Sequence, residues 1–249
     1  MRFDVITLFP ELFAPFLTAG VTRRAYETKQ VDVRLWNPRD FAEGNYRRVD
    51  DRPFGGGPGM VMLAEPLARC LAAVRADRGD AAAPVVLFAP VGDRLDHAGV
   101  EGWSASAGAI LLCGRYEGID QRFIDAEVDL EVSLGDFVLS GGELPALVLL
   151  DAVARLQEGV LGDPESHRQD SFSGGLLEGP HFSRPERLYG DQGSVPEVLL
   201  SGNHAAIARW RRDRALDLTA RRRPDLIDAA RAAGLLDAED ERYLASRQL

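Results

Sequence analysis

The stretch AILLCGRYEGID, residues 109–120, indicates how this chain of 249 residues folds. Its first five residues are wholly apolar, which is typical of a strand buried on both faces, as in a parallel sheet. The residues that follow, GRYEG at 114–118, are glycines and charged or polar residues. In open α/β sheets, ligands bind beyond the C-terminal ends of the strands. Gly114 at that edge would let a flat ring or a ribose lie against the main chain, although an ordinary turn explains it equally well.

The segments around this stretch alternate between strand and helix patterns. Short apolar runs predict strands at residues 3–9, 31–36, 85–89, 109–113 and 128–134. Apolar residues at helical spacing predict helices at residues 11–17, 21–28, 66–75 and 145–157. Alternating strands and helices predict an α/β, Rossmann-like domain on a parallel sheet.

The pattern stops at residues 158–180, which are rich in glycine and polar residues. A loop of that length inside a compact domain is usually functional or a linker. Helical periodicity returns at residues 203–218, 223–236 and 238–247, with Asn203 and Pro224 as start signals. We therefore predict an α/β domain at residues 1–160, a flexible linker at 161–175 and a small α-helical domain at 176–249.

Composition excludes several classes of protein. No apolar run approaches the ~20 residues of a membrane helix. Asp4 interrupts the apolar run that a secretory signal needs, so we expect a cytoplasmic protein. Cys70 and Cys113 have neither disulfide-framework nor metal-ligand spacing, and the four histidines are dispersed, so no metal site is predicted. The dinucleotide fingerprint, the P-loop and the nucleophile elbow are all missing.

The charge is unevenly distributed. The whole chain carries −10, which argues against a nucleic-acid binder. Residues 91–165 hold 15 acidic residues and 4 arginines, whereas residues 201–223 hold 7 arginines and 2 aspartates. In that basic segment four arginines surround Trp210, an arrangement that suits RNA phosphates but also an ordinary solvated helix face. Arginine binds phosphate in a bidentate manner, which lysine does not.

Two more glycine-rich loops and one charged pair suggest a site. DDRPFGGGPGM, residues 50–60, suits a loop that approaches a ligand closely, or a plain surface turn. SLGDFVLSGGELPAL, residues 133–147, sets main-chain amides beside apolar side chains, which can hold an adenine. This loop and the one after residue 113 follow successive strands and could converge on one pocket. Arg155 lies near the end of the helix that follows residues 133–147. Asp170 lies in the irregular segment at residues 158–180, where an aspartate is most often solvated or a helix cap.

Four motifs together resemble one family, the bacterial tRNA (guanine-N1-)-methyltransferases of the SPOUT superfamily of knotted enzymes. They are DDRPFGGGPGM, CGRYEGID, LGDFVLSGGELPA and LSGNHAAIARWR, and the likeness runs nearly end to end. The family modifies the guanosine on the 3′ side of the anticodon, tRNA position 37. The resemblance implies a deep C-terminal trefoil knot in the α/β domain and a helical domain that binds tRNA. It also implies a homodimer with each active site at the subunit interface, and no membrane or DNA partner.

The resemblance also implies roles for residues. S-adenosylmethionine would be the cofactor, and family members need Mg²⁺ for turnover. Asp170 would be the catalytic base, and Arg155 would stabilise guanine O6 or orient that base. The implied cofactor-binding residues are Ala89, Pro90, Gly114, Tyr116, Glu117, Leu134, Gly135, Asp136, Phe137, Val138, Leu139, Gly141, Gly142 and Pro145. The implied substrate-binding residues are Arg52, Gly55, Gly56, Gly57, Pro58, Gly59, Arg115, Arg209, Arg211 and Arg212.

Three alternatives compete with this interpretation. The first is a SPOUT enzyme that methylates another RNA nucleotide, for example at a ribose 2′-oxygen; the GGGPGM motif and Asp170 argue against it. The second is a non-catalytic RNA-binding protein on the same fold, which would have lost the cofactor loops or the base. The third, an α/β oxidoreductase, lacks its fingerprint.

Overall fold

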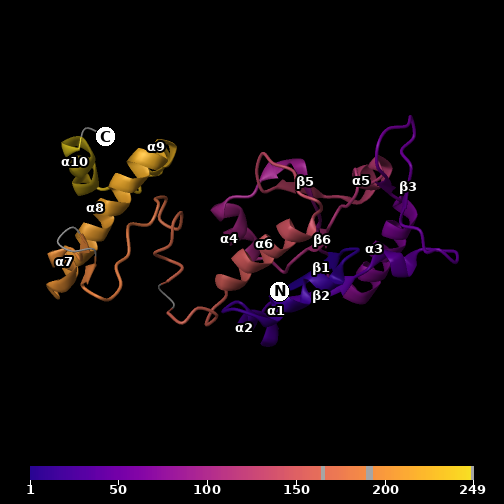
Figure 1. Ribbon diagram of the computed structural model, residues 1–249, viewed down its shortest axis with the longest axis horizontal. Helices are drawn as coiled ribbons and strands as arrows, with labels where there is room; N and C mark the ends of the chain where they lie inside the picture. Colours follow the sequence, from indigo (N-terminus) through magenta and orange to yellow (C-terminus); the bar gives the residue numbers. More distant parts are fainter. Residues whose placement is uncertain (164–165, 189–192, 248–249) are drawn as a thin grey trace. The chain divides into compact units, whose positions relative to one another are not determined.

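The computed structural model describes residues 1–163, 166–188 and 193–247. The chain divides into two compact units, Met1–Gly162 and Asp163–Leu249 (Figure 1). Residues 164–165 of the predicted linker, and 189–192 and 248–249 of the predicted helical domain, lie outside the described residues. Over these ranges, no helix has the length and apolar character needed to cross a membrane.

The first unit is built on a five-stranded sheet in which all neighbouring strands are parallel. The strand order is β2 (Asp32–Trp36), β1 (Arg2–Ile6), β6 (Ile110–Leu112), β5 (Val85–Arg94) and β7 (Leu130–Ser133). In the central strand β6, Leu111 packs into the core on one face, and Ile110 and Leu112 pack into the core on the other. The prediction of an α/β fold on a parallel sheet is confirmed by this parallel pairing. The apolar run at residues 109–113 is explained by the burial of β6 on both faces.

Helices cover both faces of the sheet. Side chains of α1 (Ala14–Thr18), α2 (Arg23–Glu27), α4 (His97–Ser104) and α6 (Glu143–Arg155) contribute to one core cluster. Those of α3 (Ala64–Arg78) and α5 (Gln121–Glu127) contribute to the other. Two 3₁₀ turns, η1 (Pro10–Leu12) and η2 (Pro38–Phe41), and the hairpin of β3 (Asp50–Asp51) and β4 (Val61–Met62), complete the unit.

The structure differs from the sequence prediction at several boundaries. The helix predicted at 11–17 is divided into η1 and α1, because Pro15 has no N–H and stands in the first turn of α1. Strand β5 continues beyond residue 89 to Arg94 and pairs with β7 on both sides of a register shift. Helices α4 and α5 were not predicted, since each has only about two turns. Each nevertheless has an aspartate cap: Asp96 accepts from Gly99 N, and Asp120 from Arg122 N.

The second unit is mainly helical. It contains β8 (Arg187–Leu188) paired with β9 (Gly193–Ser194), then α7 (Glu197–Leu200), α8 (His204–Arg222), α9 (Pro224–Ala232) and α10 (Ala238–Ser246). Both predicted start signals are confirmed: Asn203 accepts a hydrogen bond from Ala206 N, and Pro224 is the first residue of α9. Helix α8 runs past the predicted residue 218, because buried Leu216 and Thr219 hold its last turns against the unit.

Candidate functional site

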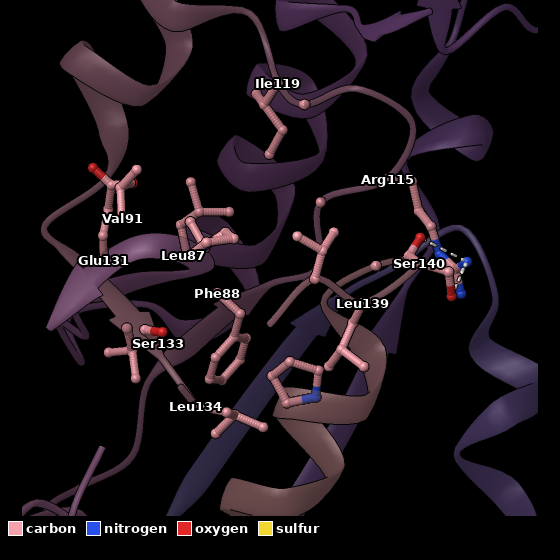
Figure 2. Close-up of a pocket in the computed structure, with 18 of the residues that line it drawn as sticks. Leu87, Phe88, Val91, Arg115, Ile119, Glu131, Ser133, Leu134, Leu139 and Ser140 are labelled. Carbon is pink, nitrogen blue, oxygen red and sulfur yellow. Dashed lines mark hydrogen bonds between the residues drawn. The ribbon is translucent and has the colours of Figure 1, made fainter. Parts of the chain in front are cut away.

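A cavity of about 420 Å³ lies beside the C-terminal edge of the sheet in the first unit. Its walls are strand β5, the loop after β6 and the loop between β7 and α6. Figure 2 shows apolar side chains of these segments, including Phe88, Leu134 and Leu139, around the same space. Of the predicted cofactor-binding residues, the lining contains Ala89, Pro90, Gly114, Tyr116, Glu117, Leu134, Gly135, Phe137, Val138, Leu139, Gly141 and Pro145.

Two predicted cofactor-binding residues do not line this cavity. The side chain of Asp136 is 94% exposed and pairs with Arg94 at 3.1 Å. Gly142 lies behind the wall, where its N–H donates to Gly114 O at 3.0 Å. A Cβ on Gly142 would lie 2.7 Å from the Cα of Cys113. Gly142 therefore allows the loop before α6 to pack directly against the end of β6.

Several lining residues escaped sequence reasoning, among them Ile119, Glu131, Ser133 and Ser140. Ser133 is buried, and its hydroxyl accepts from Gly135 N at 3.1 Å, which shapes the start of the loop after β7. In the sequence, these residues are marked only by their position beside the predicted cofactor-binding residues. Which of them points inward depends on the packing of the loops.

The GGGPGM loop, residues 55–60, joins β3 to β4, and its C-terminal end contacts the cavity wall at Glu117. Glu117 N donates to Met60 O at 3.0 Å, and Met62 N donates to Gly118 O at 2.9 Å. Gly59 has a φ of +74°, and a Cβ there would lie 2.2 Å from the Glu117 carboxylate. Of the predicted substrate loop, Gly59 is thus next to the cavity-lining residue Glu117, whereas Arg52, Gly55, Gly56, Gly57 and Pro58 are exposed and do not line the cavity.

Burial raises the pKa of two thiols and one tyrosine in the first unit. Burial raises the pKa of the Cys113 thiol well above its ordinary value, and the negative charge of Glu143 raises it further. Burial also raises the pKa of the Cys70 thiol, to about 12. The pKa of Tyr116 is raised by burial and by the carboxylate of Asp50. Both cysteines are free, buried and protonated at neutral pH, so neither has the thiolate that a nucleophile requires.

A second cavity, of about 600 Å³, lies within the second unit. It is lined by Asp170, Arg211 and Arg212, which the sequence singled out, together with Arg168 and His181. The segment that carries half-buried Asp170 is attached to α8. Leu177 N donates to the hydroxyl of Thr219 at 2.9 Å, and Leu176 packs in the core of the unit. Arg155 lies at the end of α6 in the first unit, so the two predicted catalytic residues belong to different units.

The arginines of α8 differ in their surroundings. Arg209 pairs with Asp213 and Asp240, and Arg212 pairs with Asp240 at 2.8 Å and donates to Leu235 O. Asp240 is 2% exposed. Arg211 is exposed, and no carboxylate in the described part of the chain pairs with it. The basic run is therefore not uniform, because internal aspartates partly neutralise two of its three predicted substrate-binding arginines.

Comparison with known proteins decides the family. A family model described as tRNA (guanine-1)-methyltransferase TrmD matches residues 1–229. The chain is 69% identical to a tRNA (guanine-N(1)-)-methyltransferase of Paracidovorax citrulli, with 98% of each chain covered. It is also 69% identical to that of Leptothrix cholodnii over the whole of both chains, and 54% identical to that of a Janthinobacterium species over 99% of each.

The chain belongs to the tRNA (guanine-1)-methyltransferase family. The family predicted from the four motifs is confirmed, and the protein is a methyltransferase. This family implies S-adenosylmethionine as the methyl donor. The cavity of the first unit fits such a group, because its volume lies in the usual range for small-molecule sites and it combines apolar faces with main-chain edges.

The described residues show no comparable side-chain cluster for the Mg²⁺ ion that the family resemblance implies. Within residues 1–163, 166–188 and 193–247, no group of three or more His, Cys, Asp or Glu side chains is arranged to hold a metal ion. Mg²⁺ usually keeps several waters and is bound through one or two carboxylates together with substrate phosphates, so an ion that binds with the tRNA would not require such a group.

Proposed function

We propose that this enzyme transfers a methyl group from S-adenosylmethionine to N1 of the guanosine on the 3′ side of the anticodon, at tRNA position 37. The observation that carries the proposal is the attachment of the GGGPGM loop to the wall of the cofactor-sized cavity. A guanine held by that loop would lie next to a methyl donor in the cavity. We expect the enzyme to act in the cytoplasm, where its substrate is found.

The cavity is proposed to hold the methyl donor by its two glycine-rich walls. Main-chain groups near Gly114 and Gly135 would meet the polar edge of an adenine, and Leu134 and Leu139 would cover its faces. When bound, S-adenosylmethionine supplies a methyl group on a sulfonium, which is electrophilic without further activation. The protein must therefore act on the nucleophile.

Guanine N1 carries a proton, so its lone pair is unavailable until a base removes that proton. We assign this role to Asp170, whose carboxylate would take the N1 proton. Negative charge then develops on O6, and the permanent cation of Arg155 would stabilise it or orient Asp170. A positioned base is typically worth ~10²–10⁴-fold in rate, and stabilisation of developing charge adds to it.

The target base must leave the anticodon stack to reach the cavity, which single-stranded loops allow at low cost. Arg211 borders the same cavity of the second unit as Asp170, so phosphate contacts there would bring the base and the RNA together. Arg209 and Arg212 would contribute less, because each already pairs with an aspartate.

A homodimer is proposed on the basis of the outer face of α6. One side of this helix is buried in the core, while Leu144 and Val148, one turn apart, are 53% and 49% exposed. Phe9 and Leu12 of the η1 region are also exposed. A second copy would cover such apolar side chains. Arg155 lies about 15 Å along α6 from Pro145, away from the cavity of its own chain, which favours a site completed by two copies.

The trefoil knot also remains a proposal. Two close passages of the chain support it. A Cβ on Gly142 would lie 2.7 Å from the Cys113 backbone, and one on Gly92 would lie 2.4 Å from the Glu131 backbone. Close approaches of this kind are required where one segment passes through a loop of another, although that of Gly92 also joins neighbouring strands β5 and β7.

The function is tested by methyl transfer from labelled S-adenosylmethionine to two tRNA transcripts that differ only at position 37, guanosine or adenosine. We expect label only on the guanosine transcript, recovered as N1-methylguanine after digestion. Equal labelling of both would mean that another nucleotide is the target. Labelling of neither, with cofactor binding demonstrated, would contradict methyl transfer to this tRNA.

A further inference from the structure

Glu143 is a buried carboxylate that the proposed chemistry does not use. It is the first residue of α6 and is 1% exposed. Its Oε1 accepts a hydrogen bond from the hydroxyl of Thr7 at 2.9 Å, and its Oε2 lies 2.9 Å from Nε of Arg115. A charge removed from water at this depth is tolerated only when it is paired, so Glu143 depends on Arg115.

Arg115 joins the two glycine-rich walls of the cavity. It belongs to the loop after β6, but its Nη1 donates to Ser140 O at 3.1 Å, in the loop before α6. Figure 2 shows this contact at the edge of the cavity. The guanidinium also lies 4.4 Å from the centre of the Phe9 ring, a cation–π distance. The side chain is therefore held by Glu143, Ser140 and Phe9 together.

The backbone leaves space for this pair at Gly141. A Cβ on Gly141 would lie 2.4 Å from Nε of Arg115 and 2.6 Å from Oε2 of Glu143. The ion pair thus occupies the volume that any larger residue would fill. Gly141 and Arg115 both line the cavity, so Arg115 is part of the cavity wall and Glu143 lies behind it.

We propose that Glu143 is a positioning residue: by holding Arg115 against Ser140, it fixes the distance between the two loops that enclose the cofactor cavity. The inference rests on the proposed function, since it takes the cavity as the S-adenosylmethionine site. Loss of the charge at position 143 frees Arg115, allows the loops to separate and weakens cofactor binding before any tRNA is present.

The test is titration calorimetry of S-adenosylmethionine into the full-length protein without tRNA. We expect Glu143→Gln to weaken binding about tenfold, and Arg115→Gln to do the same. The double variant should bind about as weakly as either single variant, because both changes break one contact. Glu127→Gln is the matched control. It also removes the charge of a glutamate paired with an arginine, Arg75 at 2.6 Å, but it is not among the residues that line the cavity.

Four outcomes separate the possibilities. Unchanged binding by Glu143→Gln, or losses that multiply in the double variant, would overturn the role of Glu143. If Glu143→Gln does not fold, Gly141→Ala replaces it. That variant keeps both charges but crowds the pair, and it must also weaken binding for the inference to stand.

A wild-type protein that fails to bind S-adenosylmethionine would overturn the proposed function instead. A higher KM for tRNA with unchanged cofactor affinity would show that Arg115 serves the RNA alone.

Discussion

At the scale of single residues, Asp170 provides the sharpest test of the chemistry. Its segment is anchored to α8 through the hydrogen bond from Leu177 N to Thr219, so a change at the carboxylate leaves the surrounding fold in place. We predict that Asp170→Asn lowers the single-turnover rate of methyl transfer by about 10²–10⁴-fold, because the proton on guanine N1 loses its acceptor. Affinity for S-adenosylmethionine should be unchanged, as calorimetry would show. Near-normal turnover would remove Asp170 from the mechanism.

Glycine gives a second prediction at this scale, from two residues whose backbones both tolerate alanine. A Cβ on Gly142 would meet the backbone of Cys113 at 2.7 Å, whereas a Cβ on Gly102 in α4 would meet no atom within 4 Å. We expect Gly142→Ala to lower the free energy of unfolding by about 1–3 kcal/mol through overpacking. Gly102→Ala should raise it by about 0.5–1 kcal/mol, since alanine favours helix. Urea denaturation measures both, and equal effects would contradict the close passage at Cys113.

At the scale of elements, neighbouring arginines of α8 should have opposite roles. Arg211 is exposed beside Asp170, so we predict that Arg211→Ala weakens tRNA binding and reduces the salt slope of that binding by about one, with no change in stability. Arg212→Ala removes a partner of buried Asp240 and should lower the free energy of unfolding by about 1 kcal/mol or more. Filter binding over a range of salt and urea denaturation separate the two, and a salt slope unchanged by Arg211→Ala would contradict this division.

At the scale of the whole molecule, a site completed by two copies predicts complementation. Asp170→Asn has an intact cavity but no base. Leu134→Arg keeps the base but places a cation in the cavity, opposing the sulfonium. Each should be inactive alone. When both chains are expressed together with different tags, the purified heterodimer should regain activity, because in the proposed dimer the cavity of one chain would meet Asp170 of the other. An inactive heterodimer would mean that each chain uses its own Asp170.

The local sequence determined the longer elements of the sheet and its helices, and the candidate loops. The apolar strand at residues 109–113 predicted a sheet buried on both faces, and glycine-rich segments after strands predicted where a cavity would form. Both predictions depend on short-range properties, namely hydrophobic period and glycine content. The same reasoning missed α4 and α5, because two turns of helix carry too little periodicity, although Asp96 and Asp120 mark their starts.

Only the tertiary structure decided which residues far apart in the sequence form ion pairs or pack against each other. In the sequence, Glu143 stands only in a glycine-rich segment before the helix predicted at residues 145–157, yet in the structure it begins α6 and contacts Arg115 and Thr7 from two other parts of the chain. Likewise, Arg211 and Arg212 are adjacent and chemically identical, but only Arg212 faces Asp240. Such contacts depend on the packing of segments far apart in the sequence. The sequence therefore shows where each charge and each glycine stands along the chain, while the fold determines which residues they contact.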